Sequence, residues 1–214
     1  MKNFHPSTNY ERLLIALLLF ALASCSHSST TPERKQEPFS LPIEEFELTE
    51  RSGKKVRNAD LRGKVWIASF VFTRCTGTCK QITATMERLQ GELANEKDVR
   101  LVTFTVDPAH DDPAELHKYA ERHHADKSRW LFLTGEEKEI HRLLKESFKV
   151  PVARSEKGKP GDEYDHSTRL VVVDRQGNVR GYYQGIADES SSGDGVEGEL
   201  KKLKEKVAAL LREP

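Results

Sequence analysis

From residue 39 onward, the chain alternates between short apolar runs and amphipathic stretches. Residues 65–72 form an almost unbroken apolar run, which predicts a central strand covered on both faces. Residues 99–106 predict a second buried strand, and residues 130–133 predict a third, shorter one. Alternating apolar and polar residues over 43–48 indicate a half-buried strand at the edge of the sheet.

Amphipathic stretches with helical spacing separate these strands. Residues 78–94 repeat apolar side chains at intervals of three and four. Residues 112–115 place an aspartate cap, a proline and a glutamate in the order that favours the start of a helix. Residues 134–137 repeat the capping pattern ahead of another helix. A last helix is predicted from near Asp194, and its buried stripe comprises Leu200, Leu203, Val207 and Leu210.

The order of these elements predicts the fold class. Residues 174–178 are rich in turn formers and separate two apolar runs at 170–173 and 181–183, which indicates a hairpin. We therefore expect an α/β fold with a mostly parallel sheet, an antiparallel hairpin at its edge and helices on both faces. The thioredoxin fold has this order. We expect one such domain over residues 38–214, and we find no internal repeat.

The amino terminus has the organisation of an export signal. Lys2 and Arg12 precede an apolar core at residues 13–23, which is about half the roughly 20 residues that a helix needs to cross a bilayer. Residues 22–25, Leu-Ala-Ser-Cys, then resemble the bacterial lipobox. That resemblance implies a signal peptide over 1–24 and a mature chain that begins at lipidated Cys25. The alternatives are a plain cleavable signal with a chance cysteine and an uncleaved transmembrane anchor.

The segment after Cys25 is rich in serine, threonine, proline and charge up to residue 37, so we expect a flexible tether over 25–37. Two or more acyl chains hold a protein firmly on a bilayer, whereas one chain is marginal. We therefore expect a protein of the bacterial cell envelope that is lipid-anchored to a membrane and faces the periplasm.

Charge and cysteine content narrow the function classes. The 34 lysines and arginines equal the 34 aspartates and glutamates, and no basic cluster dominates, which argues against a nucleic-acid partner. The three cysteines are too few for a disulfide scaffold. Cys75 and Cys79 form a close pair within the domain, and this pair requires a chemical explanation.

The Cys75–Cys79 spacing suits either a metal or a disulfide. Four residues of separation at the start of a helix bring both sulfurs to one face. The helix dipole, together with the neighbouring cations Arg74 and Lys80, favours the thiolate form. Soft thiolates select Cu(I), zinc or iron–sulfur iron, but two ligands are too few for a stable site. A structural disulfide remains open on this spacing alone.

His166 is the candidate third ligand. It precedes the apolar run at 170–173, at the end of the sheet where ligand sites of open α/β folds lie. Two thiolates and one imidazole suit Cu(I) better than structural zinc, which takes four ligands. Asp165 could orient the imidazole. A single histidine beside a strand is more often structural than a ligand, so the residues alone leave this choice open.

Five motifs together resemble the Sco/SenC family of copper proteins that serve cytochrome c oxidase assembly. They are residues 60–64, residues 70–73 leading into Cys-x-x-x-Cys, residues 105–113, residues 130–135, and 165–168. The resemblance runs from about Phe39 to Tyr183 in family order. It implies a thioredoxin-like fold, and copper held by Cys75, Cys79 and His166. It also implies a metallochaperone for the binuclear copper site of an oxidase subunit.

The chain departs from the family pattern at one place. Prolines usually follow both cysteines in the family, whereas this sequence has Thr76 and Lys80. Without the first proline, and with Gly77 beside it, the loop is less constrained by its own backbone. The ligand set is retained, but the resemblance leaves the metal affinity and the redox potential open.

Two other activities fit the cysteine pair. A periplasmic thiol–disulfide oxidoreductase would use the low-pKa cysteine to keep partner cysteines reduced. Dedicated oxidoreductases of this fold normally use Cys-x-x-Cys with a cis-proline loop, whereas this chain offers His166 there. A thiol peroxidase would need a peroxide-binding donor set, which residues 73–75 suggest only faintly.

The remaining polar candidates have ordinary structural explanations. Asp107 either lies near the site or fixes its loop through backbone hydrogen bonds, and Asp112 is a helix cap. The other histidines show no ligand spacing, and we expect them on the surface: His110, His117, His123, His124 and His141.

Overall fold

The structure is a computed structural model that describes residues 39–155, 159, 161, 163–187 and 195–213. The predicted signal peptide, the lipidated Cys25 and the tether lie outside these residues. Within the described residues, no helix is both long enough and apolar enough to cross a bilayer.

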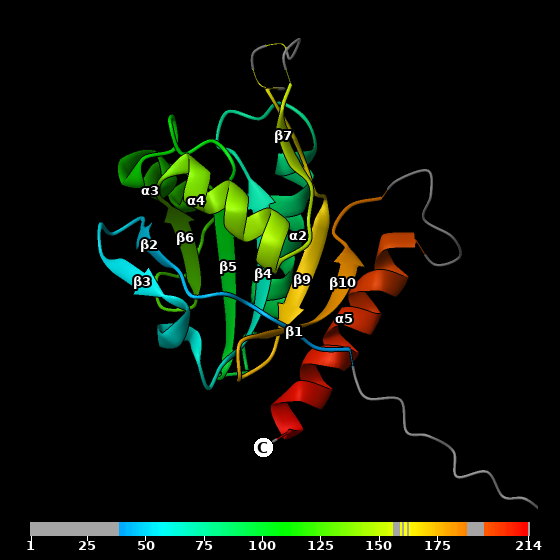
Figure 1. Cartoon of the computed structure of the whole chain (residues 1–214). Helices are drawn as coiled ribbons and strands as arrows, with labels where there is room; N and C mark the ends of the chain where they lie inside the picture. Colours follow the sequence, from blue (N-terminus) through cyan, green and yellow to red (C-terminus); the bar gives the residue numbers. More distant parts are fainter. Residues whose placement is uncertain (1–38, 156–158, 160, 162, 188–194, 214) are drawn as a thin grey trace, which may run out of the picture. The chain divides into compact units, whose positions relative to one another are not determined.

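An eight-stranded sheet forms the centre of the fold, in the order β1-β10-β9-β4-β5-β6-β2-β3 (Figure 1). The buried runs read from the sequence are its middle strands. The strands are β1 (Leu41–Pro42), β2 (Glu47–Glu50), β3 (Lys55–Arg57), β4 (Val65–Val71), β5 (Val99–Thr105), β6 (Trp130–Thr134), β9 (Arg169–Val173) and β10 (Asn178–Gln184). All seven residues of β4 are buried, as expected for a strand covered on both faces.

The α/β, thioredoxin-like class is confirmed, but the sheet is less parallel than expected. Among the described strands, only the pairs β4–β5 and β5–β6 run parallel. Strand β9 lies antiparallel to β4, and β10 and β1 continue that edge, while β2 and β3 form an antiparallel edge on the other side. The expected hairpin is therefore β9–β10. The strand predicted over 43–48 is instead β2, a few residues further on.

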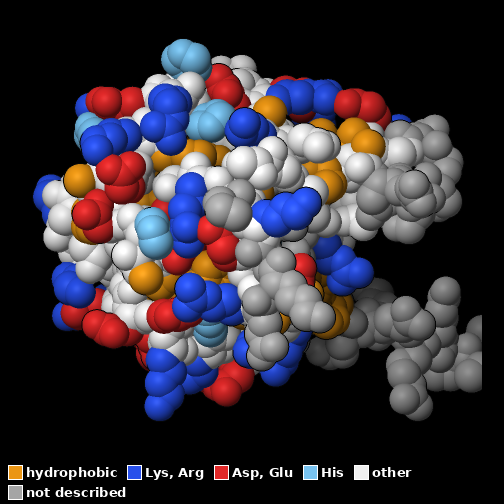
Figure 2. Space-filling view, turned by 90° about the horizontal axis from the view of Figure 1, so that it is seen from above, with side chains coloured by type: hydrophobic (Ala, Val, Ile, Leu, Met, Phe, Trp, Pro, Cys, Tyr) orange, Lys and Arg blue, Asp and Glu red, His pale blue; other side chains and the backbone are white. Residues whose placement is uncertain are grey.

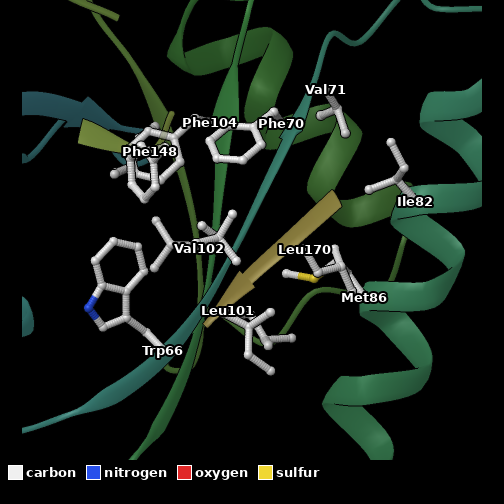
Figure 3. Packing of buried hydrophobic residues seen from close by; sticks show 14 of the residues in the cluster. Trp66, Phe70, Val71, Ile82, Met86, Leu101, Val102, Phe104, Phe148 and Leu170 are labelled. Carbon is white, nitrogen blue, oxygen red and sulfur yellow. The ribbon is translucent and has the colours of Figure 1, made fainter. Parts of the chain in front are cut away.

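Helices cover both faces of this sheet. The helices are η1 (Asn58–Leu61), α2 (Thr78–Glu92), α3 (Pro113–Arg122), α4 (Glu137–Arg142), the π-helical turn η2 (Leu143–Ser147) and α5 (Gly195–Arg212). Side chains of α2 and of the segment after η2 pack against opposite faces, as Figure 3 shows for Met86 and Phe148. The predicted stripe of α5 is buried at Leu200, Leu203, Val207 and Leu210.

Of the two helix caps predicted at residues 112–115 and 134–137, the structure contains the first and not the second. Asp112 caps α3 and accepts a hydrogen bond from the Glu115 amide at 2.8 Å, as predicted. The pattern at 134–137 does not cap a helix, because Thr134 ends β6 and α4 begins only at Glu137 without a side-chain cap. The helix then widens into η2, where the Phe148 amide bonds to the Leu143 carbonyl five residues back.

Aromatic packing fixes the end of β4 in space. The ring centroid of Phe148 lies 5.2 Å from that of Phe70 on β4 and 5.2 Å from that of Phe104 on β5 (Figure 3). On the other face, Ile82 and Met86 of α2 pack into the same core. Such aromatic contacts add stability beyond their buried area. The chain that leaves β4 therefore starts from a rigid position.

The structure also contains a second, two-stranded sheet that the sequence did not predict. Strand β7 (Val152–Arg154) pairs antiparallel with β8 (Tyr164–His166), so His166 lies at the end of a hairpin and not in the loop before β9. Each strand has only three residues, too few to show the alternation from which strands are read.

Replacing Asp112 with alanine should lower the free energy of unfolding by about 1 kcal/mol, because the Glu115 amide loses its acceptor. Urea denaturation at constant m-value measures this change. Asp112→Asn keeps an acceptor and should lose only a fraction of that amount. An Asp112→Asn variant as unstable as Asp112→Ala would contradict the capping role.

Candidate metal centre

The cysteine pair lies where β4 passes into α2. The loop after Phe72 carries Cys75, and Cys79 occupies the first turn of α2. Both cysteines are free thiols, and they are buried to 9% and 1% exposure. The spacing predicted this placement, because the helix begins at Thr78 and turns the second sulfur back toward the first.

The hairpin β7–β8 brings His166 to the two sulfurs. The Nε2 atom of His166 lies 3.1 Å from the Sγ atom of Cys79. One ligand atom from each of Cys75, Cys79 and His166 lies within 4.8 Å of the other two. No other group of three potential metal ligands comes together in the part of the chain that the structure describes. The three residues predicted from the sequence therefore form one site.

The backbone orients the ring of His166. Its Nδ1 atom lies 3.2 Å from the carbonyl oxygen of Ser167. A carbonyl only accepts hydrogen bonds, so Nδ1 donates to it and Nε2 is the nitrogen that faces the sulfurs. Asp165 was expected to orient the ring, but its side chain is exposed. The Ser167 carbonyl takes that role, which residue types alone do not reveal.

Aromatic rings form one wall of the site. The ring of Phe72 stands edge-on to His166 at 5.8 Å and to Tyr164 at 5.7 Å between centroids. A cavity of about 270 Å³ opens beside Cys75 and His166, and its other lining residues are Gly77, Thr78, Tyr164, Asp165 and Thr168. Aromatic rings therefore cover the site on the Phe72 side, and the cavity leaves its other side accessible to solvent.

The two cysteines differ strongly in acidity. A hydrogen bond from the Cys79 side chain lowers the pKa of Cys75 to about 4 against the opposing effect of burial, and His166 and the amides of Gly77 and Cys79 add to this. Burial raises the pKa of Cys79, and the neighbouring Cys75 raises it further. The pair therefore holds one thiolate, at Cys75, and one thiol, at Cys79.

The cations expected to stabilise the thiolate are engaged elsewhere or point outward. Arg74 forms ion pairs with Asp107 at 2.8 Å and with Glu163 at 2.6 Å. Lys80 is exposed. The groups that lower the pKa of Cys75 most are the hydrogen-bond donors around its sulfur. Local hydrogen bonding, more than nearby positive charge, thus makes this thiol acidic.

Two buried aspartates, Asp107 and Asp111, hold the cysteine loop through hydrogen bonds to Arg74 and Thr73. Asp107 accepts hydrogen bonds from Arg74, and its own backbone carbonyl accepts from the amides of His110 and Asp111. Asp111 accepts from the amide and hydroxyl of Thr73 and from the hydroxyl of Thr105. Asp107 therefore has the loop-fixing role. The sequence pattern contained Asp111 but gave no sign that it contacts Thr73.

The remaining histidines are not all on the surface. His110 and His124 are exposed, and His117 is partly exposed with an ion-pair contact to Glu121. His141, in contrast, is largely buried, and its Nε2 atom lies 3.0 Å from the Val106 carbonyl. His123 is half-buried against the Tyr119 ring at 4.7 Å. The surface prediction for these last two was wrong because the Tyr119 ring covers His123, and the Tyr164 ring and the Val106 carbonyl cover His141.

Charged side chains of both signs share the face of the domain that Figure 2 shows, where Lys and Arg are interspersed with Asp and Glu.

The fold and the three ligands define the class of protein: a thioredoxin-like domain whose cysteine pair is completed by a histidine.

The comparisons with known proteins place this class in a family. The model of the SCO1/SenC family matches residues 34–201. The SCO1 protein homolog of Bacillus subtilis strain 168 is 32% identical over 191 residues, which cover 88% of this chain and 94% of that protein. The chain belongs to the SCO1/SenC family.

Solved structures agree with this assignment. A SCO1/SenC family lipoprotein from Bacillus anthracis is 31% identical, with a TM-score of 0.69 over 81% of this chain and 98% of that one. BsSco is 30% identical, with a TM-score of 0.69 over 84% of this chain and 98% of that one, and is described as a member of the Sco family of cytochrome c oxidase assembly proteins with a disulfide switch. Copper-bound yeast Sco1 shares the fold at 24% identity and a TM-score of 0.60.

Reduced, metal-free protein should carry one thiolate between about pH 6 and pH 8, since Cys75 is ionised there and Cys79 is not. The ultraviolet absorbance of the thiolate, followed against pH, measures this. Cys79→Ala removes the main donor to Cys75 and should move the titration upward toward the usual thiol pKa. A titration near pH 8.5 in the unaltered protein would contradict the assignment.

Proposed function

We propose that this protein binds copper through Cys75, Cys79 and His166 and serves as a metallochaperone for the binuclear copper site of a cytochrome c oxidase subunit. The observation that carries the proposal is the convergence of two sulfurs and one imidazole nitrogen within 4.8 Å. Membership of a family whose relatives assemble cytochrome c oxidase supports the partner.

The donor set favours Cu(I). Thiolates are soft ligands, and imidazole suits copper as well as zinc. Structural zinc takes four protein ligands, and the described residues supply three. The Nε2 atom of His166 already faces the sulfurs, so this ligand requires no rotation of its ring. Cys79 must release its proton on binding, and copper affinity should therefore rise with pH.

The geometry also suits a transfer protein. Phe72 closes one side of the site, while the cavity of about 270 Å³ leaves the Cys75 and His166 side accessible. A partner's ligands can approach from that side and exchange with those of the chaperone. A low-coordinate ion is well suited to such exchange, because an incoming ligand adds to it before another leaves.

Anaerobic titration of the reduced protein with Cu(I), in competition with a chromophoric chelator, should give one tightly bound ion per chain. His166→Ala should weaken binding at least about a hundredfold, because even residues that only orient a ligand cost about 10–100-fold. His117→Ala lies outside the site and should bind as the unaltered protein does. Unchanged affinity in His166→Ala would remove His166 from the ligand set.

A thiol–disulfide oxidoreductase remains the second candidate, because the pair combines a thiolate with a thiol at close range. Formation of a Cys75–Cys79 disulfide would pass two electrons to an oxidised partner and release the one proton of Cys79, because Cys75 is already a thiolate. A disulfide-exchange assay separates the two functions. We expect slow turnover that Cu(I) suppresses, since metal binding occupies both sulfurs. Rapid turnover that is insensitive to His166→Ala would favour the oxidoreductase.

We further propose that Cys25 is lipidated and anchors the domain to the membrane of a bacterial cell, facing the periplasm. The lipobox-like residues 22–25 support this, as does the relative from Bacillus anthracis described as a lipoprotein. Cys25→Ser should move the protein from the membrane fraction to the soluble fraction, because the acyl chains are lost. Membrane retention of Cys25→Ser would contradict the anchor.

A further inference from the structure

Polar contacts join the cysteine loop to the hairpin that carries His166. Arg74, directly before Cys75, donates to Glu163 through Nη1 at 2.6 Å. Glu163 lies three residues before His166 in the chain. The other side of the Arg74 guanidinium donates to buried Asp107, which lies after β5. The arginine therefore links three separate segments at the site. Its side chain is 32% exposed and that of Glu163 is 15% exposed, so the pair is partly shielded from water.

The backbones of the two segments touch at the same place. The amide of Thr76 donates to the carbonyl of Gly161 at 3.1 Å, and the amide of Gly161 donates to Glu163 at 2.9 Å. Gly161 has φ +89, and a Cβ there would lie 2.6 Å from Cγ2 of Thr76 and 3.0 Å from the carbonyl oxygen of Arg74. Only glycine therefore allows this close approach.

This contact depends on the residue that distinguishes the chain from the usual family pattern. A proline at position 76 would have no amide hydrogen and could not donate to Gly161. Thr76 thus gives up the rigidity of a proline and gains a hydrogen bond to the opposite segment. The cysteine loop is therefore constrained by a hydrogen bond to Gly161, where a proline ring would constrain it in the usual family pattern.

Contacts on both sides of His166 place the hairpin: after it, the Thr168 carbonyl accepts from the Gly185 amide at 3.1 Å and the chain enters β9. Strands β7 and β8 have three residues each. Tyr164 packs on Phe72 and donates to Glu137 at 3.2 Å, which fixes the middle of β8. The residues that lead into β8 are held by the contacts to Arg74 and Thr76. Two fixed points on one short strand set both its position and its direction.

We infer that Arg74, Thr76, Gly161 and Glu163 form a tie between the cysteine loop and the segment before β8, and that this tie positions His166 against the two cysteines. These are positioning residues, since they act on the metal through the imidazole. The inference rests on the proposed copper-binding function only where copper affinity is the readout.

The first experiment measures Cu(I) affinity in Arg74→Gln, Glu163→Gln and the double variant. Each single variant should weaken binding about 10–100-fold, and the double variant little further, because both break one tie. Arg88→Gln removes an exposed ion pair with Glu197 outside the cavity and should stay within about twofold of the unaltered protein. Additive losses in the double variant would contradict the tie.

A matched pair tests the backbone contact. Thr76→Ala keeps the amide hydrogen and should bind Cu(I) as the unaltered protein does. Thr76→Pro removes the hydrogen and should bind about tenfold more weakly, even though it restores the usual family residue. Tighter binding by Thr76→Pro would overturn the inference.

Two further readouts separate positioning from a general loss of stability. In a His166→Ala background, Arg74→Gln should have no further effect on Cu(I) affinity, because the residue that it positions is gone. In metal-free protein, nitrogen-detected NMR of the imidazole should report one set of ring-nitrogen signals, and in Arg74→Gln a shifted or heterogeneous set, because the ring no longer keeps one position beside the sulfurs. An unchanged imidazole spectrum in Arg74→Gln would overturn the tie even if the chain bound no copper, whereas a wild-type chain without copper affinity would overturn only the proposed function.

Discussion

The contact between the Cys79 sulfur and the His166 imidazole joins two segments that lie 87 residues apart in the chain. Each segment reaches this point from a different part of the fold. The first comes from the end of β4, whose residues are buried on both faces, and the second from a short hairpin outside the main sheet. The chemistry of the site depends on this contact, because two sulfurs without the imidazole form only a disulfide-capable pair.

The two segments are held by different kinds of contact. The aromatic cluster of Phe70, Phe104 and Phe148 fixes β4, and Asp111 holds Thr73 beyond its end. The loop that carries the cysteines is therefore attached to a well-packed part of the core. The histidine depends on contacts made by side chains of neighbouring segments, above all Tyr164 and Glu163. A preformed pair of sulfurs that is completed by a third ligand from a separate segment suits a protein that must both take and release a metal ion.

Strong local patterns made much of this structure predictable. The apolar run of β4, the cap at Asp112 and the stripe of α5 all became the elements that they predicted. The direction of the outer strands did not follow from the sequence, because pairing is decided by contacts between distant segments. Strands β7 and β8 were missed for a related reason: three residues carry no readable period.

The sequence likewise predicted only part of the site. Spacing and resemblance identified Cys75, Cys79 and His166 as ligands, whereas the groups that orient the imidazole and lower the pKa of Cys75 became visible only in the structure. The Ser167 carbonyl, and not Asp165, is the hydrogen-bond partner of the imidazole. Arg74 was expected to stabilise the thiolate, but it pairs with the carboxylates of Asp107 and Glu163. Backbone carbonyls and ion pairs between distant residues leave no local signal.

X-ray absorption spectroscopy of the protein loaded with one equivalent of Cu(I) identifies the atoms that bind the metal. We expect two sulfur ligands and one nitrogen ligand, and the loss of the nitrogen contribution in His166→Ala. A coordination shell of sulfur alone in the unaltered protein, or one that His166→Ala leaves unchanged, would rule out a site made of the two cysteines and the histidine.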